Sequence, residues 1–194
     1  MVYSIADKTK YYRQNNNEIK PGIRCKPTAT IEGLDLAGWP LPSGSRKQPE
    51  DNLTEWMESH LGKDSPEEWG MIVQAINGHF LPNDKPLTLR WNWSIEEALF
   101  SIVERKPFVL SSALTDAGHI VGLVEFETKS EKVPKSYQEI NLADIVRIFI
   151  DDPYGKKVNG KYDTSLSGFR VEYSLAEFKR IWRGIGIQIK RKAT

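Results

Sequence analysis

The order of the helix and strand signals is the feature that most constrains how this chain can fold. Three serines are each followed three residues later by a glutamate, a capping-box pattern that marks a helix start. Segments rich in β-branched and aromatic residues, with partial alternation, come mostly after the first helical segments. The predicted helices are 53–61, 65–77, 94–105 and 174–183, and the predicted strands are 107–114, 118–128, 144–151 and 184–190.

Because helices and strands do not alternate one by one, the pattern lacks the βαβ repeat of a parallel sheet. It predicts the α+β class with a largely antiparallel sheet. A chain of 194 residues can bury a sizeable core, and we expect one domain over residues 1–194. Residues 40–49 have the composition of a turn-rich connector. The polar loop 129–143 is longer than a hairpin needs.

Composition excludes several classes of protein. The net charge of +1 provides no field that would attract nucleic acid or membranes. A single cysteine excludes a disulfide framework, and with three scattered histidines it predicts neither a metal site nor another cofactor. No apolar run approaches the roughly 20 residues that span a bilayer. The N-terminus has no signal-peptide core, so we expect a cytoplasmic protein or one released without a cleaved signal.

The single cysteine, Cys25, lies just before Pro27 and a predicted helix that ends near Gly38. The first turn of a helix has unpaired backbone N–H groups and the positive end of the helix dipole, and both favour a thiolate. Cys25 is therefore a candidate nucleophile, although free cysteines are more often buried and inert. Gly33 within this helix predicts close packing against another element.

A thiolate nucleophile needs a histidine partner, and that histidine needs an orienting acceptor. His119 follows a glycine at the start of a predicted strand, which would hold its ring at a fixed point. A purely structural strand histidine is the alternative. His60 lies near a helix end, where a cation suits the dipole, and is expected to be structural. His79 follows a predicted helix stop and has no evident partner.

The segment "IFIDDPYG" ends a predicted strand with two aspartates. Asp152 is held extended by the proline that follows it, and it could accept a hydrogen bond from an imidazole on a neighbouring strand. An ordinary Asp-Pro turn is the alternative. Asp151 also stays open as the orienting acid, because a one-residue change of register exchanges the faces of the two aspartates.

Four segments, in this order, resemble the bacteriocin-leader-processing cysteine peptidase family, more specifically its stand-alone relatives with a papain-like fold. The resemblance implies a papain-like fold in which an N-terminal helical part, carrying the nucleophile helix, packs on a mainly antiparallel sheet. The four segments cover about half of the chain and read "KYYRQNNNEIKPGIRCKPTATIEGL", "WSIEEALFSIVERKPFVLSSAL", "GHIVGLVEFE" and "IFIDDPYG".

Carried over by position, the resemblance implies a role for four residues. Cys25 would be the nucleophile and His119 the general base that becomes the general acid. Asp152 would orient His119, and Gln14 would donate its side-chain amide to the oxyanion together with the Cys25 backbone N–H. The implied activity is hydrolysis of a peptide bond in a peptide or protein substrate, with a peptidoglycan cross-bridge as one candidate.

The chain departs from the family pattern in three places. Residues 40–93, with helices and four tryptophans of their own, are interpreted as a helical insertion between the nucleophile helix and the histidine half. The strand after His119 continues where the family has Gly-Tyr, and the loop 129–143 replaces a short hairpin. The tryptophans could line a peptide or glycan groove or pack in the core. Substrate preference therefore stays open.

Two other readings of the same residues remain. One is a non-catalytic binding module that keeps the fold, against which the intact Cys, His, Asp and Gln set argues. The other is an amidase or acyltransferase that uses the same thiol on a non-protein amide. Leader peptidases are normally fused to a transporter, and this chain has no membrane segment, so leader processing is the less expected role.

Overall fold

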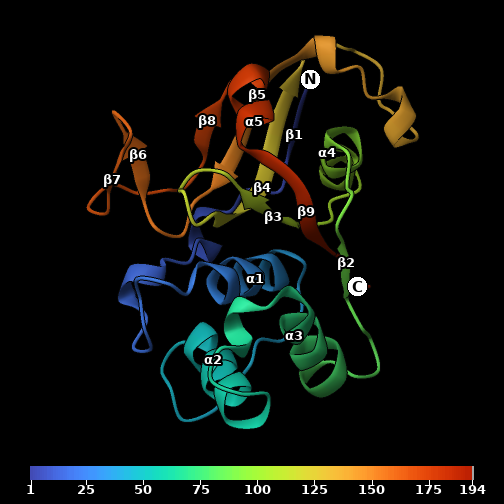
Figure 1. Cartoon of the computed structure of the whole chain (residues 1–194). Helices are drawn as coiled ribbons and strands as arrows, with labels where there is room; N and C mark the ends of the chain where they lie inside the picture. Colours follow the sequence, from blue (N-terminus) through green and yellow to red (C-terminus); the bar gives the residue numbers. More distant parts are fainter. Residues whose placement is uncertain (194) are drawn as a thin grey trace.

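The computed structural model in Figure 1 describes residues 1–193 of the chain. It has the α+β architecture that the sequence predicts, with a main sheet in the strand order β2-β9-β3-β4-β5-β8 and β1 paired to β4. Each described strand pair is antiparallel. The main-sheet strands are β1 (Val2–Ser4), β2 (Leu87–Arg90), β3 (Phe108–Ser112), β4 (His119–Thr128), β5 (Ile145–Asp151), β8 (Val171–Tyr173) and β9 (Trp182–Ile189), while β6 (Lys156–Val158) and β7 (Lys161–Asp163) form a separate hairpin.

The helices cover both faces of the sheet. In Figure 1, α1 lies beneath the sheet, with α2 and α3 below it. α4 and α5 pack with the opposite face. Within residues 1–193, no helix is both long and apolar enough to cross a membrane. The helices are α1 (Cys25–Leu36), α2 (Pro49–His60), α3 (Trp69–Gln74), α4 (Ile95–Val103) and α5 (Leu175–Ile181), with a π-helical turn over Ala75–Phe80.

Two hydrophobic clusters lie on the two faces of the sheet. Along β3, Val109 contributes to the cluster shared with α1, α2 and α3. Its neighbours Phe108 and Leu110 contribute to the cluster shared with α4 and α5. This division follows from the strand geometry, in which successive side chains point to opposite faces. The central strands are therefore buried on both sides.

Gly33 confirms the close packing that the sequence predicts. A Cβ atom built at Gly33 would lie 2.5 Å from Cδ1 of Ile189 and 3.4 Å from Cγ2 of Val109. The absence of a side chain therefore lets α1 approach β9 and β3 closely. This approach fixes how the helix that begins with Cys25 rests on the sheet.

Most predicted elements are confirmed, but the helix predicted over 65–77 is confirmed only from Trp69 onward. The capping boxes at Ser94 and Ser174 are both formed. By contrast, Ser65 begins a single 3₁₀ turn, Glu68 is extended, and α3 starts only at Trp69. The ammonium of Lys26 takes the Glu67 carbonyl as its acceptor, so a tertiary contact replaces a helical bond there.

Gly78 does not end that helical segment either. It lies inside the π-helical turn, which closes with a hydrogen bond from Leu81 N to Ile76 O of 2.7 Å. Strands β1, β2, β6, β7 and β8 are missing from the predicted set. Each has three or four residues, which is too short for a periodic pattern to stand out. The long loop 129–143 contains two 3₁₀ turns, Tyr137–Glu139 and Leu142–Asp144.

Candidate active site

Cys25 is the first residue of α1, where it forms a half-buried free thiol. Arg24 occupies the N-cap position without a side-chain capping bond. The first turn of a helix leaves backbone N–H groups without intrahelical acceptors, and Pro27 is tolerated there because it lacks such a group. The thiol therefore sits beside donors that could hydrogen-bond an anion.

Ion pairs around one buried arginine hold the segment that leads into Cys25. The guanidinium of Arg24, 1% exposed, pairs with Glu58 of α2 and with Glu67 of the 3₁₀ turn. Lys20 also reaches Glu58, at 2.9 Å. On the other side of Cys25, Lys26 lies 5.0 Å over the ring of Trp69, and burial lowers the pKa of its ammonium, against the raising effect of the Glu67 charge. The helices of the predicted insertion thus position the thiol.

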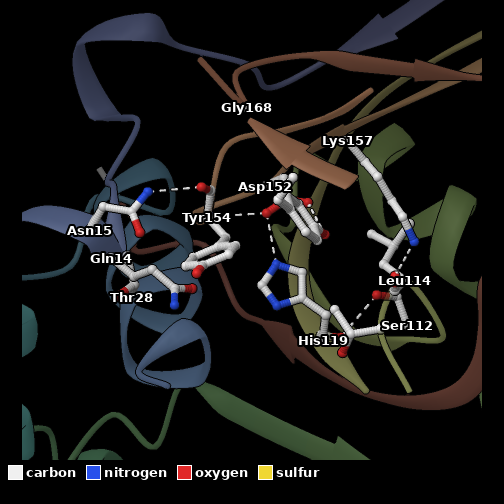
Figure 2. Close-up of polar contacts among 12 residues, drawn as sticks. Gln14, Asn15, Thr28, Ser112, Leu114, His119, Asp152, Tyr154, Lys157 and Gly168 are labelled. Atoms are coloured by element: carbon white, nitrogen blue, oxygen red, sulfur yellow. Dashed lines mark hydrogen bonds and ion pairs between the residues drawn. The ribbon is translucent and has the colours of Figure 1, made fainter. Parts of the chain in front are cut away.

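His119 and Asp152 are joined by a buried hydrogen bond. Nε2 of His119, the first residue of β4, lies 2.7 Å from Oδ1 of Asp152, which directly follows β5. The two side chains are 6% and 2% exposed. Figure 2 shows the imidazole edge facing the carboxylate and the second ring nitrogen directed away from it. One nitrogen is therefore oriented by an acid, and the other is left for a second partner.

Asp152 is held by further donors. The backbone N–H of Tyr154 donates to Oδ1 at 2.9 Å, and the Tyr162 hydroxyl, from β7, donates to Oδ2 at 2.8 Å. Tyr11 donates to the Asp152 carbonyl at 2.7 Å. The rings of Tyr154 and Tyr162 also make edge contacts with the His119 ring, with centroids 6.3 and 5.6 Å apart. These tyrosines shield the His119–Asp152 bond from water.

The charge of His119 is stabilised despite its burial. Burial alone lowers the pKa of the imidazole, but hydrogen bonds to Asp152 and Cys25, together with their charges, outweigh it and raise the pKa to about 10. The thiol of Cys25 thus adds to the stabilisation of the positively charged ring. The ring is thus an imidazolium at neutral pH in this arrangement.

Gln14 is buried next to the turn that carries Asp152. Its backbone N–H donates to Pro153 O at 2.9 Å, and its side-chain Nε2 donates to Pro21 O at 2.8 Å. The neighbouring Asn15 donates to Tyr154 O at 2.8 Å, as Figure 2 shows. One N–H of the Gln14 amide is used by Pro21, which leaves the second N–H of that amide for another acceptor.

The structure distinguishes the two aspartates that the sequence left open. His119 bonds to Asp152, whereas Oδ1 of Asp151 accepts from the backbone N–H of Arg170 at 2.6 Å. Asp151 is the last residue of β5 and pairs with Gly122 of β4. The strand register therefore turns Asp151 away from the imidazole and leaves Asp152, one residue later, to face it.

His60 and His79 lie elsewhere, stacked on Trp56. Their ring centroids are 4.6 and 4.2 Å from that of Trp56. His79, for which the sequence offers no evident partner, thus packs against a tryptophan of a different helix. Among residues 1–193, no group of three or more His, Cys, Asp or Glu side chains could hold a metal ion. Of the insertion tryptophans, Trp69 and Trp93 are buried and Trp91 is 63% exposed.

The three tyrosines around Asp152 are the part of the site that sequence reasoning missed. Tyr154 lies in the quoted segment "IFIDDPYG" and could have been found there. Tyr11 likewise lies in the quoted segment that begins "KYYRQ", whereas Tyr162 carries no sequence signal, because only the folded chain brings it to Asp152. Together, a thiol, an imidazole, a carboxylate and nearby amide donors form the set of groups that nucleophilic acyl transfer requires.

Comparison with known proteins gives one structural likeness. No family model and no curated protein matches the sequence. Among solved structures, the chain is similar to the crystal structure of a Bacillus anthracis protein provisionally named as a C39-like peptidase, with a TM-score of 0.59 and 13% sequence identity. The alignment covers 98% of this chain and 99% of the other. The chain therefore has the fold of a C39-like peptidase, a papain-like arrangement of helices and antiparallel sheet.

Proposed function

We propose that this protein is a cysteine peptidase that hydrolyses peptide bonds through Cys25, His119 and Asp152. The observation that carries the proposal is the buried imidazole of His119, which is hydrogen-bonded to Asp152 through Nε2. A half-buried free thiol at the head of α1 supplies the nucleophile. The likeness in fold to a C39-like peptidase supports the same reaction class. We treat residues 1–194 as one domain and 40–93 as its helical insertion.

The groups have complementary roles in acyl transfer. In the proposed reaction the Cys25 thiolate attacks the peptide carbonyl, and the free N–H of the Gln14 amide and the Cys25 backbone N–H stabilise the oxyanion. The His119 imidazolium then protonates the leaving amine, and the neutral ring activates water to release the acyl group. Asp152, held by Tyr154 and Tyr162, keeps the ring oriented throughout.

The substrate is a peptide bond in a peptide, a protein or a peptidoglycan cross-bridge. The insertion 40–93 and the β6–β7 hairpin differ from the motifs that the chain shares with leader-processing peptidases. For that reason we do not extend the proposal to a double-glycine leader. The exposed Trp91 belongs to the insertion and is one side chain through which a substrate preference could arise.

The direct test measures hydrolysis of a peptide library and of purified peptidoglycan by the wild type and by Cys25→Ala. Loss of a nucleophile typically costs about 10⁴–10⁶ in kcat/KM. We expect hydrolysis of at least one of these substrates and its loss in Cys25→Ala. Equal activity in both proteins would remove Cys25 from the mechanism.

A second measurement separates the enzyme from a binding module that keeps the fold. Iodoacetamide labelling of Cys25 at about pH 6 reports a thiolate stabilised by its surroundings, since an ordinary thiol is almost unreactive there. We expect rapid labelling in the wild type and slow labelling in His119→Ala. Slow and equal labelling in both would support the binding module. Rapid labelling without peptide hydrolysis would favour an amidase or acyltransferase.

A further inference from the structure

Two buried carboxyl groups of the sheet–helix interface have no role in the proposed reaction. Glu32 lies on α1 and Asp151 ends β5, and they are 3% and 1% exposed. One oxygen of each is satisfied: the Tyr12 N–H donates to Glu32 Oε2 at 3.4 Å, and the Arg170 N–H donates to Asp151 Oδ1 at 2.6 Å. Within residues 1–193, Glu32 Oε1 and Asp151 Oδ2 have no donor.

The two unsatisfied oxygens belong to side chains that meet beside Gly122. A Cβ atom built at Gly122 would lie 3.7 Å from Oε1 of Glu32 and 3.9 Å from Cβ of Asp151, its partner across the β4–β5 ladder. Both distances are ordinary van der Waals contacts, so the two side chains border the same point of the sheet.

Two ionised carboxylates in such a place would repel each other and lack solvation, whereas one shared proton satisfies both oxygens. Burial raises the pKa of Glu32 well above its ordinary value, and the adjacent charge of Asp151 and a hydrogen bond between the two side chains raise it further. Burial also raises the pKa of Asp151, against the lowering effect of its bonds to Glu32 and Arg170.

We propose that Glu32 is protonated in the folded protein at neutral pH and that its O–H group donates a hydrogen bond to the Asp151 carboxylate. The carboxyl–carboxylate bond then joins α1, which begins with Cys25, to the end of β5, which is followed by Asp152. Glu32 is two helical turns from Cys25, and Asp151 precedes Asp152 directly. Glu32 is thus a positioning residue: it holds together the two elements that supply the thiol and the acid.

The other charged groups around the pair do not replace this proton. The Arg170 guanidinium is engaged by Glu125, and only its backbone reaches Asp151. Asp152 faces His119 and adds negative charge. The hydroxyls of the two neighbouring tyrosines are committed elsewhere: Tyr11 donates to Asp152 O, and Tyr12 donates to Asp35 Oδ2 at 3.1 Å. The charge of Arg170 lowers the pKa of Asp151, whereas Asp152 raises that of Glu32, so the proton is favoured on Glu32.

The pH dependence of unfolding tests the shared proton without any assay of activity. A carboxyl group whose pKa is raised by folding contributes stability that is present at low pH and is lost as the pH rises from its unfolded value towards its folded value. Glu32→Gln cannot ionise, but its amide can still donate to Asp151. We therefore expect the unfolding constant of the wild type, relative to Glu32→Gln, to rise up to about tenfold per pH unit above about pH 4.5.

Two controls isolate the pair. Glu50 is another buried glutamate, and burial raises its pKa to about 7. Its contribution to the pH dependence cancels, because the wild type and Glu32→Gln both contain it. Glu131→Gln changes an exposed carboxyl group to an amide and should leave the pH dependence unchanged. Infrared spectra of the folded protein at neutral pH should contain a protonated-carboxyl band that Glu32→Gln removes and Glu131→Gln retains. Asp151→Asn should also weaken this band, which keeps the test decisive if Glu32→Gln folds poorly.

The shared proton would be disproved if the unfolding constants of the wild type and Glu32→Gln differed by the same factor at every pH. It would also be disproved if neither Glu32→Gln nor Asp151→Asn changed the infrared band. The positioning role rests on the proposed function and has its own readout. The rate of Cys25 alkylation should fall in Glu32→Ala, and the amide of Glu32→Gln should restore it. If the proton is present but no variant alters alkylation, only the positioning role fails. If the proton is present and no peptide is cleaved, only the proposed peptidase activity fails.

Discussion

The helical half that carries Cys25 and the sheet half that carries His119 and Asp152 fix their side chains by different means. On the helical side, a buried cation, Arg24, is neutralised by Glu58 and Glu67 from later parts of the chain. On the sheet side, Asp152 is held by neutral donors, the Tyr162 hydroxyl and the Tyr154 backbone. The thiol is thus placed by ion pairs across helices, and the imidazole by strand register and hydrogen bonds.

This difference predicts which substitutions would displace the functional side chains of each half. Breaking an ion pair of a buried residue leaves an uncompensated charge. The position of the thiol segment therefore depends on α2 and its neighbouring turn, which supply the counter-charges of Arg24. The sheet side has no such dependence, because backbone pairing between β4 and β5 already brings His119 and Asp152 within reach. In the two proposals above, the halves meet at Cys25 and His119 and at the Glu32–Asp151 pair. The predictions below address this meeting, in order of expected effect.

Asp152→Asn should have the largest effect and tests the sheet half. An amide would hold His119 without stabilising its positive charge, and comparable changes reduce kcat about 10⁴-fold. We expect a loss of about 10²–10⁴ in kcat/KM and a lower melting temperature, because the imidazolium loses its counter-charge. Asp116→Asn, an exposed aspartate just before β4, is the matched control. A similar loss in both variants would mean that the acid acts only through the overall charge.

The titration of His119 tests whether the halves interact. Its raised pKa means that the proton stabilises the folded state fully below about pH 6.5 and that this stability is lost as the pH rises towards about 10. Stability should fall by up to about 1.4 kcal/mol per pH unit in that window. An NMR pH titration of the His119 ring in the wild type and in Cys25→Ala measures this pKa. Cys25→Ala should lower the pKa of His119. Identical titrations would show that the thiol does not reach the ring.

Gln14→Ala tests the proposed oxyanion donor, whose side chain bonds to Pro21 and whose backbone bonds to Pro153, next to Asp152. Removal of one oxyanion donor typically costs about 10²–10³ in kcat. We expect this loss to appear mainly in kcat and not in KM, because the donor acts on charge that develops in the transition state. The exposed Gln138→Ala is the control. A change in KM alone would assign Gln14 to substrate binding.

Gly168→Ala should break the turn that frames Asp152. A Cβ atom there would overlap the Asp152 carbonyl oxygen and lie 2.7 Å from Gly155 O and 2.8 Å from the Tyr11 hydroxyl. Backbone atoms cannot move aside cheaply, and overpacking of this kind costs about 1–3 kcal/mol. Gly70→Ala on α3, with no atom within 4 Å, should instead be neutral or stabilising by up to about 1 kcal/mol. Urea unfolding of both variants measures their stabilities. A Gly168→Ala variant more stable than Gly70→Ala would contradict this prediction.

Tyr162→Phe should have the smallest effect. It removes the hydroxyl donor to Oδ2 of Asp152 but keeps the ring that covers His119. A hydrogen bond to a charged group contributes about 1.5–3 kcal/mol, so we expect a destabilisation of that order at most. The exposed Tyr137→Phe serves as the control. Equal stability of Tyr162→Phe and the wild type in urea unfolding would show that the hairpin does not support the acid.

Local patterns were enough for much of this protein. The helix starts at Ser94 and Ser174, the four long strands and the close packing at Gly33 all follow from short-range capping chemistry, side-chain period and residue size. These properties depend on neighbours in the sequence, so one sequence reveals them. The four candidate site residues were likewise identified by type and order, and the catalytic roles of these residues stay predictions.

Tertiary structure alone decided the rest, because the deciding contacts join residues far apart in the chain. The helix predicted over 65–77 was interrupted when Lys26 took a carbonyl acceptor from that segment. Strand register, which no local signal sets, turned Asp152 towards His119 and Asp151 towards Glu32. The sequence by itself determined which chemical groups this chain possesses, and only the packing of α1 on the sheet determined which of them face one another, since burial and register act over distance.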